Sequence, residues 1–178
     1  MKWETLSSFY PFKTKWLTVR QDHVRMPSGH EMDDFYIIES RDWVSIIAIT
    51  TEGKFVLERQ YRQGLQRVCV ELPGGCVDDG EQPLESAKRE LLEETGYSGG
   101  KWYEFGHFAP NSSGMNNMAH CFIADGVVQF AAPTLESSED IEIILVSIDQ
   151  VRELIESEQI READLVAPLW KYLYKYGK

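Results

Sequence analysis

From Gly75 to Tyr97 the chain reads GCVDDGEQPLESAKRELLEETGY, and this stretch decides how the fold is interpreted. Pro83 stands where the first turn of a helix tolerates proline, and Gly96 is the type of residue that follows a helix C-terminus. We therefore predict a helix from about Pro83 to Thr95. It lies between a glycine-rich turn and a predicted strand.

The predicted helix carries three carboxylates on one face. Glu90, Glu93 and Glu94 are spaced i, i+3 and i+4, so their side chains lie close together around the axis. Like charges repel unless a cation lies among them, and oxygen-rich sites suit Mg²⁺ or Mn²⁺. Taken alone, the helix also fits a solvated acidic face on which Arg89 makes a surface ion pair.

The loop before the helix adds a second observation. A Gly-Gly turn follows a predicted strand and leaves a backbone carbonyl free, and an Asp-Gly-Glu run then leads into the helix. The whole segment resembles the Nudix box, GX5EX7REUXEEXGU, in which U is bulky and apolar. The matching positions are Gly75, Glu81, Arg89, Glu90, Leu91, Glu93, Glu94, Gly96 and Tyr97.

This resemblance implies a Nudix hydrolase, which cleaves a nucleoside diphosphate linked to another group. It implies a Nudix-type α/β/α sandwich with a mixed β-sheet. Glu90 and Glu94 would be the principal ligands of two or more Mg²⁺ or Mn²⁺ ions, with Glu93 as a ligand or a partner of one. The carbonyl of Gly74 would be a further ligand, and Arg89 would orient the carboxylates.

Two runs before the box are similar to the "QYR … ELPGG" pattern of ADP-ribose pyrophosphatases. They are ERQYR at 58–62 and VELPGG at 70–75. The resemblance implies that Arg62 contacts the diphosphate or terminal ribose, which a guanidinium can bind through two parallel hydrogen bonds. Glu71 is a second candidate for substrate binding. The alternative for Arg62 is a surface arginine that closes a hairpin.

A run after the box, ESSEDI at 136–141, is similar to an acidic loop of the same subfamily. There a glutamate binds a metal or activates the water. Glu139 is the best match and Glu136 the alternate, so both join Arg89 and Glu93 as catalytic candidates. The alternative is a solvated acidic loop.

Three residues are candidates for contacts with the sugar and the base. Pro110 lies in a loop where ADP-ribose hydrolases carry a proline near the terminal sugar. Its spacing from the box is shorter than usual, and 115–118 lacks the usual glutamate, so other nucleotide sugars stay open. Trp16 and Trp43 could stack on adenine, or they could be core residues.

Composition limits the class of protein. The 178 residues carry a net charge of −11, which disfavours nucleic-acid binding and would repel a polyphosphate unless a cation intervened. No apolar run approaches the roughly 20 residues of a membrane-spanning helix. The first residues lack the apolar stretch of a signal peptide, and the three cysteines form no CxxC pair. We expect a cytoplasmic protein that binds neither membrane nor nucleic acid.

The pattern along the chain predicts a mixed sheet with helices packed on it, an α/β (α+β) fold. Residues 1–40 form an antiparallel extension whose strands, in similar enzymes, cross to a partner subunit, so we expect a homodimer. Residues 41–178 form the Nudix domain. Strands are expected at 16–26, 35–39, 43–50, 55–62, 68–72, 102–108, 118–124 and 141–148, and helices at 83–95, after an N-cap at Asp149, and at about 162–176.

The function that follows is Mg²⁺-dependent hydrolysis of ADP-ribose or a related nucleoside diphosphate sugar into two monophosphates. Two alternatives stay open. One is a Nudix hydrolase for another nucleotide, such as an oxidised nucleoside triphosphate, a dinucleoside polyphosphate or a GDP-sugar. The other is a non-catalytic sensor of nucleotide sugars.

Overall fold

The computed structural model describes residues 1–15 and 17–177, and the chain divides into two compact units. The first unit contains Met1–Arg41 and Ala109–Met118. The second contains Asp42–Phe108 and the chain from Ala119 onward. Among the helices in these ranges, none is long and apolar enough to cross a membrane.

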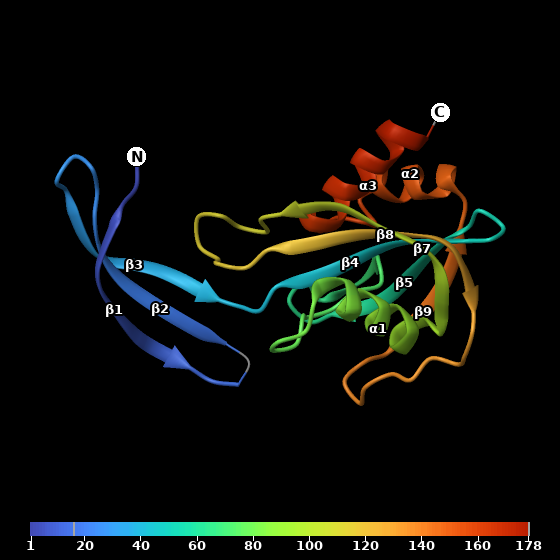
Figure 1. Ribbon diagram of the computed structural model, residues 1–178, viewed down its shortest axis with the longest axis horizontal. Helices are drawn as coiled ribbons and strands as arrows, with labels where there is room; N and C mark the ends of the chain where they lie inside the picture. The colour runs from blue at the N-terminus through green and yellow to red at the C-terminus, as the bar shows by residue number, and fades with distance from the viewer. Residues whose placement is uncertain (16, 178) are drawn as a thin grey trace. The chain divides into compact units, whose positions relative to one another are not determined.

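The second unit is built on a mixed six-stranded sheet (Figure 1). The strand order is β6-β5-β4-β8-β7, with β9 also paired to β5. β4 and β8 run parallel, whereas the other pairs are antiparallel. The strands are β4 (Trp43–Thr50), β5 (Phe55–Arg62), β6 (Arg67–Glu71), β7 (Tyr97–Phe108), β8 (Ala119–Gln129) and β9 (Ile141–Val146).

Helices cover both faces of this sheet. The buried residues of β4 show this, because successive side chains point to opposite faces and belong to two different cores. Ile46 belongs to the core that contains Leu91 of α1. Its neighbour Ile47 belongs to the core that contains Val151 of α2 and Leu169 of α3. The predicted α/β/α sandwich is therefore confirmed (Figure 1). The helices are α1 (Pro83–Thr95), α2 (Ile148–Glu156) and α3 (Ala163–Tyr176).

The first half of β4 pairs with a loop instead of with β5. The backbone pairs of β4 with β5 lie at the end of the strand, at Ala48 and Ile49. Earlier along β4, the amide of Ile46 donates to the carbonyl of Pro73 at 2.9 Å, and the amide of Val44 donates to the carbonyl of Gly75 at 2.8 Å. The glycine-rich loop is therefore held to the sheet like a short additional strand.

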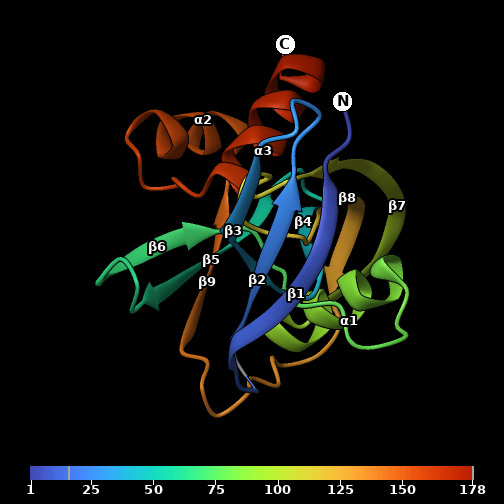
Figure 2. The same cartoon turned by 90° about the vertical axis from the view of Figure 1, so that its left-hand side faces the viewer.

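The first unit is an antiparallel three-stranded sheet (Figure 2). Its strands are β1 (Glu4–Lys13), β2 (Thr18–Arg25) and β3 (Glu31–Glu39), paired in that order. The end of β3 binds the segment 109–118, since the Ile38 amide donates to the carbonyl of Gly114 at 2.8 Å. This segment is distant in sequence from the three strands but belongs to the same unit.

Strand β1 was not predicted from the sequence. Pro11 lacks a backbone N–H and lowers the strand propensity of its segment. The structure accommodates it in an edge strand, where the register with β2 shifts between Phe9 and Phe12. The proline therefore lies where a strand can lose one backbone hydrogen bond.

The N-cap of α2 is Ser147, so the expected cap at Asp149 was wrong. The Ser147 hydroxyl accepts from the amide of Gln150 at 3.3 Å, and the Gln150 side chain accepts from the amide of Ser147 at 2.8 Å. This reciprocal capping box satisfies two amides of the first turn, which a cap at Asp149 would not. Asp149 lies inside the helix and pairs with Arg152 at 3.0 Å.

Candidate active site

A tight bend at Gly74 and Gly75 leads from β6 toward α1. A Cβ atom at Gly74 would lie 2.1 Å from the carbonyl oxygen of Val44. A Cβ atom at Gly75 would lie 2.5 Å from Oε1 of Glu90. Glycine is thus needed at both positions for different reasons, since the first admits a neighbouring backbone and the second admits a carboxylate.

One hydrogen bond joins this bend to the last turn of α1. The amide of Gly74 donates to Oε2 of Glu94 at 2.8 Å. The carbonyls on either side, those of Pro73 and Gly75, are the ones that accept from β4. Since the N–H and C=O of one extended residue point to the same side, we expect the Gly74 carbonyl on the side of Glu94.

Arg89 is the centre of a hydrogen-bond network on the same helix. It donates to both carboxylate oxygens of Glu81, at 3.1 and 2.9 Å. It also donates to Glu90 at 2.9 Å and to Glu93 at 3.1 Å. The hydrogen bonds from Arg89 lower the pKa of Glu81 to about 2. Arg89 therefore fastens the loop to the helix and fixes two of the three carboxylates.

Glu94 is the buried member of the acidic face, and Glu90 is partly buried. The Glu94 residue is 7% exposed, and the Glu90 side chain is 13% exposed. Burial raises the pKa of both carboxyls; for Glu94, burial and then the charge of Glu58 raise it to about 9. Such a site favours either protonated carboxyls or a cation between them.

Glu58 is an acidic residue of this region that the sequence interpretation missed. It lies on β5 directly opposite Glu71 on β6, and it is only 3% exposed. Burial and then the charge of Glu71 raise the pKa of Glu58 to about 8. The available signal was its position, because it ends an apolar run and follows the inward-facing Val56 by two residues.

Arg62 and Glu71 form a forked ion pair. Nε of Arg62 donates to both carboxylate oxygens of Glu71, at 2.9 and 3.1 Å, and Nη2 donates to Oε2 at 2.5 Å. The carboxylate is 6% exposed, whereas the arginine side chain is 44% exposed. The buried charge of Glu71 is thus compensated, and the guanidinium is held in one orientation at the surface.

The two glutamates after the box differ in their surroundings. Oε2 of Glu139 accepts from the amide of Glu136 at 2.7 Å, and Glu139 is partly buried. The charge of Glu139 raises the pKa values of Glu58, Glu90 and Glu94. Glu136 is exposed. Glu139 therefore belongs to the electrostatic surroundings of the buried acids.

The three residues predicted to contact the base or the sugar do not lie in one described region of the structure. Trp43 begins β4, is partly exposed, and forms a backbone bridge with Cys76 in the loop before α1. Pro110 belongs to the first unit, with the three-stranded sheet. Trp16 lies outside the described residues.

Comparison with known proteins shows the family to which the chain belongs. A family profile described as NUDIX domain matches residues 39–168. The chain belongs to the Nudix family. The prediction of a Nudix hydrolase, made from the box at 75–97, is therefore confirmed. A second profile, described as nucleoside diphosphate sugar hydrolase N-terminal domain, matches residues 3–38.

This Nudix protein has relatives that match most of its length. It is 29% identical over 161 residues to an ADP-ribose pyrophosphatase of Bacillus subtilis (strain 168). This alignment covers 90% of this chain and 86% of the relative. It is 29% identical over 164 residues to the methanol dehydrogenase activator of Bacillus methanolicus, with 92% and 88% covered. A crystal structure of ADP compounds hydrolase superposes with a TM-score of 0.86 at 20% identity and covers 99% of this chain and 97% of that one. This last match supports the fold.

Nudix hydrolases generally use divalent metal ions, and the donor set fits such an ion. Within residues 1–15 and 17–177, no three His, Cys, Asp or Glu side chains already converge as a chelating group. The acids are instead spread around Arg89, which holds Glu90 and Glu93. All candidate donors are oxygens, as Mg²⁺ and Mn²⁺ prefer. Oε1 of Glu58 is buried without a hydrogen-bond partner in the described chain, so an acceptor is free.

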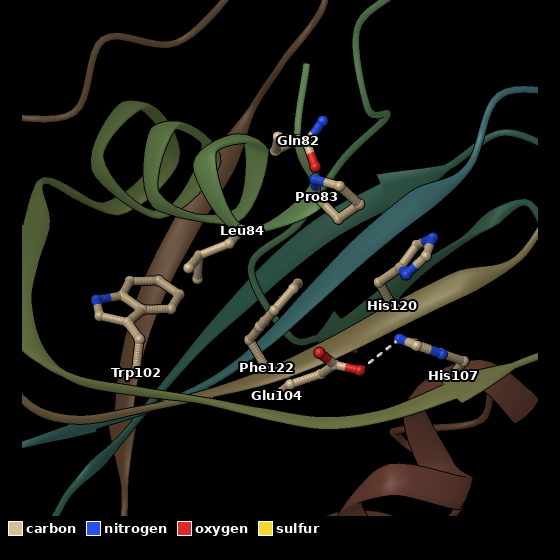
Figure 3. A pocket seen from close by; sticks show the side chains of 8 residues that line it. All are labelled: Gln82, Pro83, Leu84, Trp102, Glu104, His107, His120 and Phe122. Atoms are coloured by element: carbon tan, nitrogen blue, oxygen red, sulfur yellow. Dashed lines mark ion pairs between the residues drawn. The ribbon is translucent and has the colours of Figure 1, made fainter. Parts of the chain in front are cut away.

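A cavity of about 330 Å³ lies at the first turn of α1 in this Nudix domain (Figure 3). Leu84, Trp102 and Phe122 contribute its apolar lining. An ion pair of 2.8 Å between Glu104 and His107 contributes a polar part. The described residues that line the cavity include none of the box carboxylates, so it is distinct from the candidate metal site.

Proposed function

We propose that this Nudix protein is a Mg²⁺-dependent pyrophosphohydrolase that cleaves ADP-ribose or a related nucleoside diphosphate sugar into two monophosphates. The observation that carries the proposal is the network in which Arg89 holds Glu81, Glu90 and Glu93. These carboxylates lie beside a bend that binds Glu94. A chain with a net charge of −11 needs a cation to bring a diphosphate to such a site.

Glu90, Glu94 and the carbonyl of Gly74 would hold the cations, with Glu93 and Glu139 as further ligands. We propose two or more ions, because the acids are too many for the charge of one. A bound divalent cation would neutralise the diphosphate, polarise phosphorus and lower the pKa of the attacking water.

Glu139 is the proposed general base, and Glu136 is the alternate. Oε2 of Glu139 accepts a backbone hydrogen bond, so Oε1 is available for a proton. In the reaction the water oxygen bonds to one phosphorus, the bridging P–O bond breaks, and the proton of the water passes to Glu139. The second monophosphate leaves with the bridging oxygen. Arg89 contributes by holding the carboxylates in place.

Several features support a nucleotide sugar as the substrate. The profile that matches residues 3–38 is described by that substrate class, and the relative from Bacillus subtilis is named for ADP-ribose. Arg62, oriented by Glu71, is proposed to contact the diphosphate or terminal ribose. Trp16 and Trp43 are proposed to stack on the base, and Pro110 to lie near the terminal sugar.

We also propose that two copies of the chain form a homodimer through the first unit. Its three-stranded sheet exposes large apolar side chains, with Phe9 at 64%, Tyr36 at 54% and Phe12 at 49% exposure. An exposed apolar surface of this kind is typical of a protein–protein interface. A second copy would cover it by a two-fold contact.

The test is a panel of nucleotides assayed by phosphate release after phosphatase coupling, with and without Mg²⁺. It contains ADP-ribose, other ADP-, GDP- and UDP-sugars, an oxidised nucleoside triphosphate and a dinucleoside polyphosphate. Turnover of ADP-ribose or another nucleoside diphosphate sugar only with Mg²⁺ is the expected result. Preference for a triphosphate or dinucleoside polyphosphate would overturn the substrate class, and no turnover of any member would favour a sensor.

A further inference from the structure

Glu58 is a buried carboxylate with an unused oxygen. It is 3% exposed, and its Oε1 has no hydrogen-bond partner in the described part of the chain. An unsatisfied buried polar atom costs about 1–3 kcal/mol, and more when it is charged. Native proteins contain few such atoms, so this one needs an explanation.

Glu71, the cross-strand neighbour of Glu58, is a carboxylate whose charge is compensated. Glu58 and Glu71 lie directly opposite one another on β5 and β6, an arrangement that is destabilising for two like charges. Three hydrogen bonds from Arg62 compensate Glu71. Among the ion pairs of residues 1–15 and 17–177, none involves Glu58. Arg62 therefore compensates the charge of Glu71, whereas Glu58 has no ion-pair partner among the described residues.

The strand pattern directs Glu58 toward α1. Val56 shares a core with Ala87 and Leu91 of α1. Side chains two residues apart on a strand lie on the same face, so Glu58 is on the α1 face as well. Glu94 follows Leu91 by three residues, on the same side of the helix. Glu58 on the strand and Glu94 on the helix therefore belong to the same layer, between the sheet and α1.

We propose that Glu58 supplies an additional negative charge, from the sheet side, to the divalent-cation site of Glu90 and Glu94. Its Oε1, which has no hydrogen-bond partner among the described residues, would be available to a bound cation directly or through a water. The inference rests on the proposed function, because it extends the same site. It assigns a cation-binding role to a strand residue that lies outside the Nudix box.

The test measures Mn²⁺ binding to the purified full-length chain by the electron paramagnetic resonance of free Mn²⁺, without substrate. Glu58→Gln keeps the size and one acceptor oxygen but removes the charge. Glu142→Gln is the matched control, because it removes one charge from an exposed position on β9 (66% exposed side chain). Glu94→Gln reports on the proposed site itself. Thermal unfolding in EDTA shows whether each variant is folded.

We expect Glu58→Gln to weaken Mn²⁺ binding by about 10- to 100-fold, with Glu142→Gln unchanged. Glu58→Leu gives a second measurement, because it removes the carboxylate without putting another polar atom in its place, and it is expected to bind as weakly. Wild-type affinity in both Glu58 variants, with binding lost in Glu94→Gln, would overturn this inference alone. If the wild-type chain bound no Mn²⁺, the proposed function would fail with it.

Discussion

The amide of Gly74 and the carboxylate of Glu94 meet at 2.8 Å, so the glycine bend and the last turn of α1 are one structural unit. The hydrogen bond uses Oε2 of Glu94, so Oε1 is the oxygen that we propose for a cation. The Gly74 carbonyl, which we expect on the same side as its amide, would then lie close to this carboxylate. The positions of two proposed ligands are thus coupled.

Glu94→Gln should fold normally and lose turnover by about 100-fold or more, since a metal contributes several kcal/mol to charge stabilisation in the transition state. The glutamine can keep the contact with Gly74 through its amide oxygen. Steady-state kinetics with saturating Mg²⁺, together with circular dichroism, checks this. A folded variant with full activity would remove Glu94 from the site.

Alanine at the two glycines of the bend should have different effects. At Gly75 the new Cβ meets the carboxylate of Glu90, the end of a flexible side chain, so turnover should fall while the fold persists. At Gly74 it meets the backbone of Val44, which cannot move aside, so the free energy of unfolding should fall by about 1–3 kcal/mol. Urea unfolding and kinetics on both variants separate the two effects. Equal loss of stability in both would contradict the assignment.

The metal-free protein should become less stable as the pH rises. The pKa of Glu58 is raised to about 8 and that of Glu94 to about 9, from 4.5, so the folded chain keeps protons that the unfolded chain has released. This stabilisation is complete below pH 4.5 and is lost as the pH rises through the folded pKa values. Glu81, with its pKa lowered from 4.5 to about 2, is ionised in both states above about pH 6 and does not contribute to this loss.

Denaturant unfolding in EDTA between about pH 6 and pH 9.5 checks the pH dependence. The free energy of unfolding should fall over this range by a few kcal/mol, at about 1.4 kcal/mol per pKa unit. Glu58→Gln should flatten the profile, and saturating Mg²⁺ should restore stability at the alkaline end. A wild-type profile without slope would show that neither carboxyl keeps its proton in the folded chain.

Glu139→Gln should lower kcat more than it changes KM, because a general base acts in the chemical step. Glu136→Gln is the matched control, since Glu136 is exposed and contributes its backbone amide to Glu139. Kinetics of both variants at one Mg²⁺ concentration makes the comparison. Unchanged turnover in Glu139→Gln, with a loss in Glu136→Gln, would assign the base to Glu136.

The elements that sequence predicted well are those with local signals at both ends. The helix bounds Pro83–Thr95 agree with the structure because a proline at the start and a left-handed glycine after the end are each readable from the chain. Strand β1 has no such signal, and its proline argues against a strand. Only its pairing with β2 reveals it.

The residues of the candidate site also differ in whether the sequence could predict them. The acids of α1 could be predicted because their spacing along one helix defines a common face. Glu58 could not be assigned to the site in this way, since its position after an apolar run indicates an inward-facing strand residue but not which helix residues lie above it. Its relation to Glu94 arises from the packing of α1 on the sheet, which brings together residues 36 positions apart.

The pairing of β4 with the glycine-rich loop restricts which parts of the protein can move during turnover. Any displacement of the bend would have to break the backbone contacts of Val44 and Ile46 with Gly75 and Pro73. Those two amides should accordingly exchange with deuterium as slowly as the interior of the sheet. On the proposed function, this bend would form a fixed floor for the phosphates, and any motion that admits the substrate would have to come from other parts of the site.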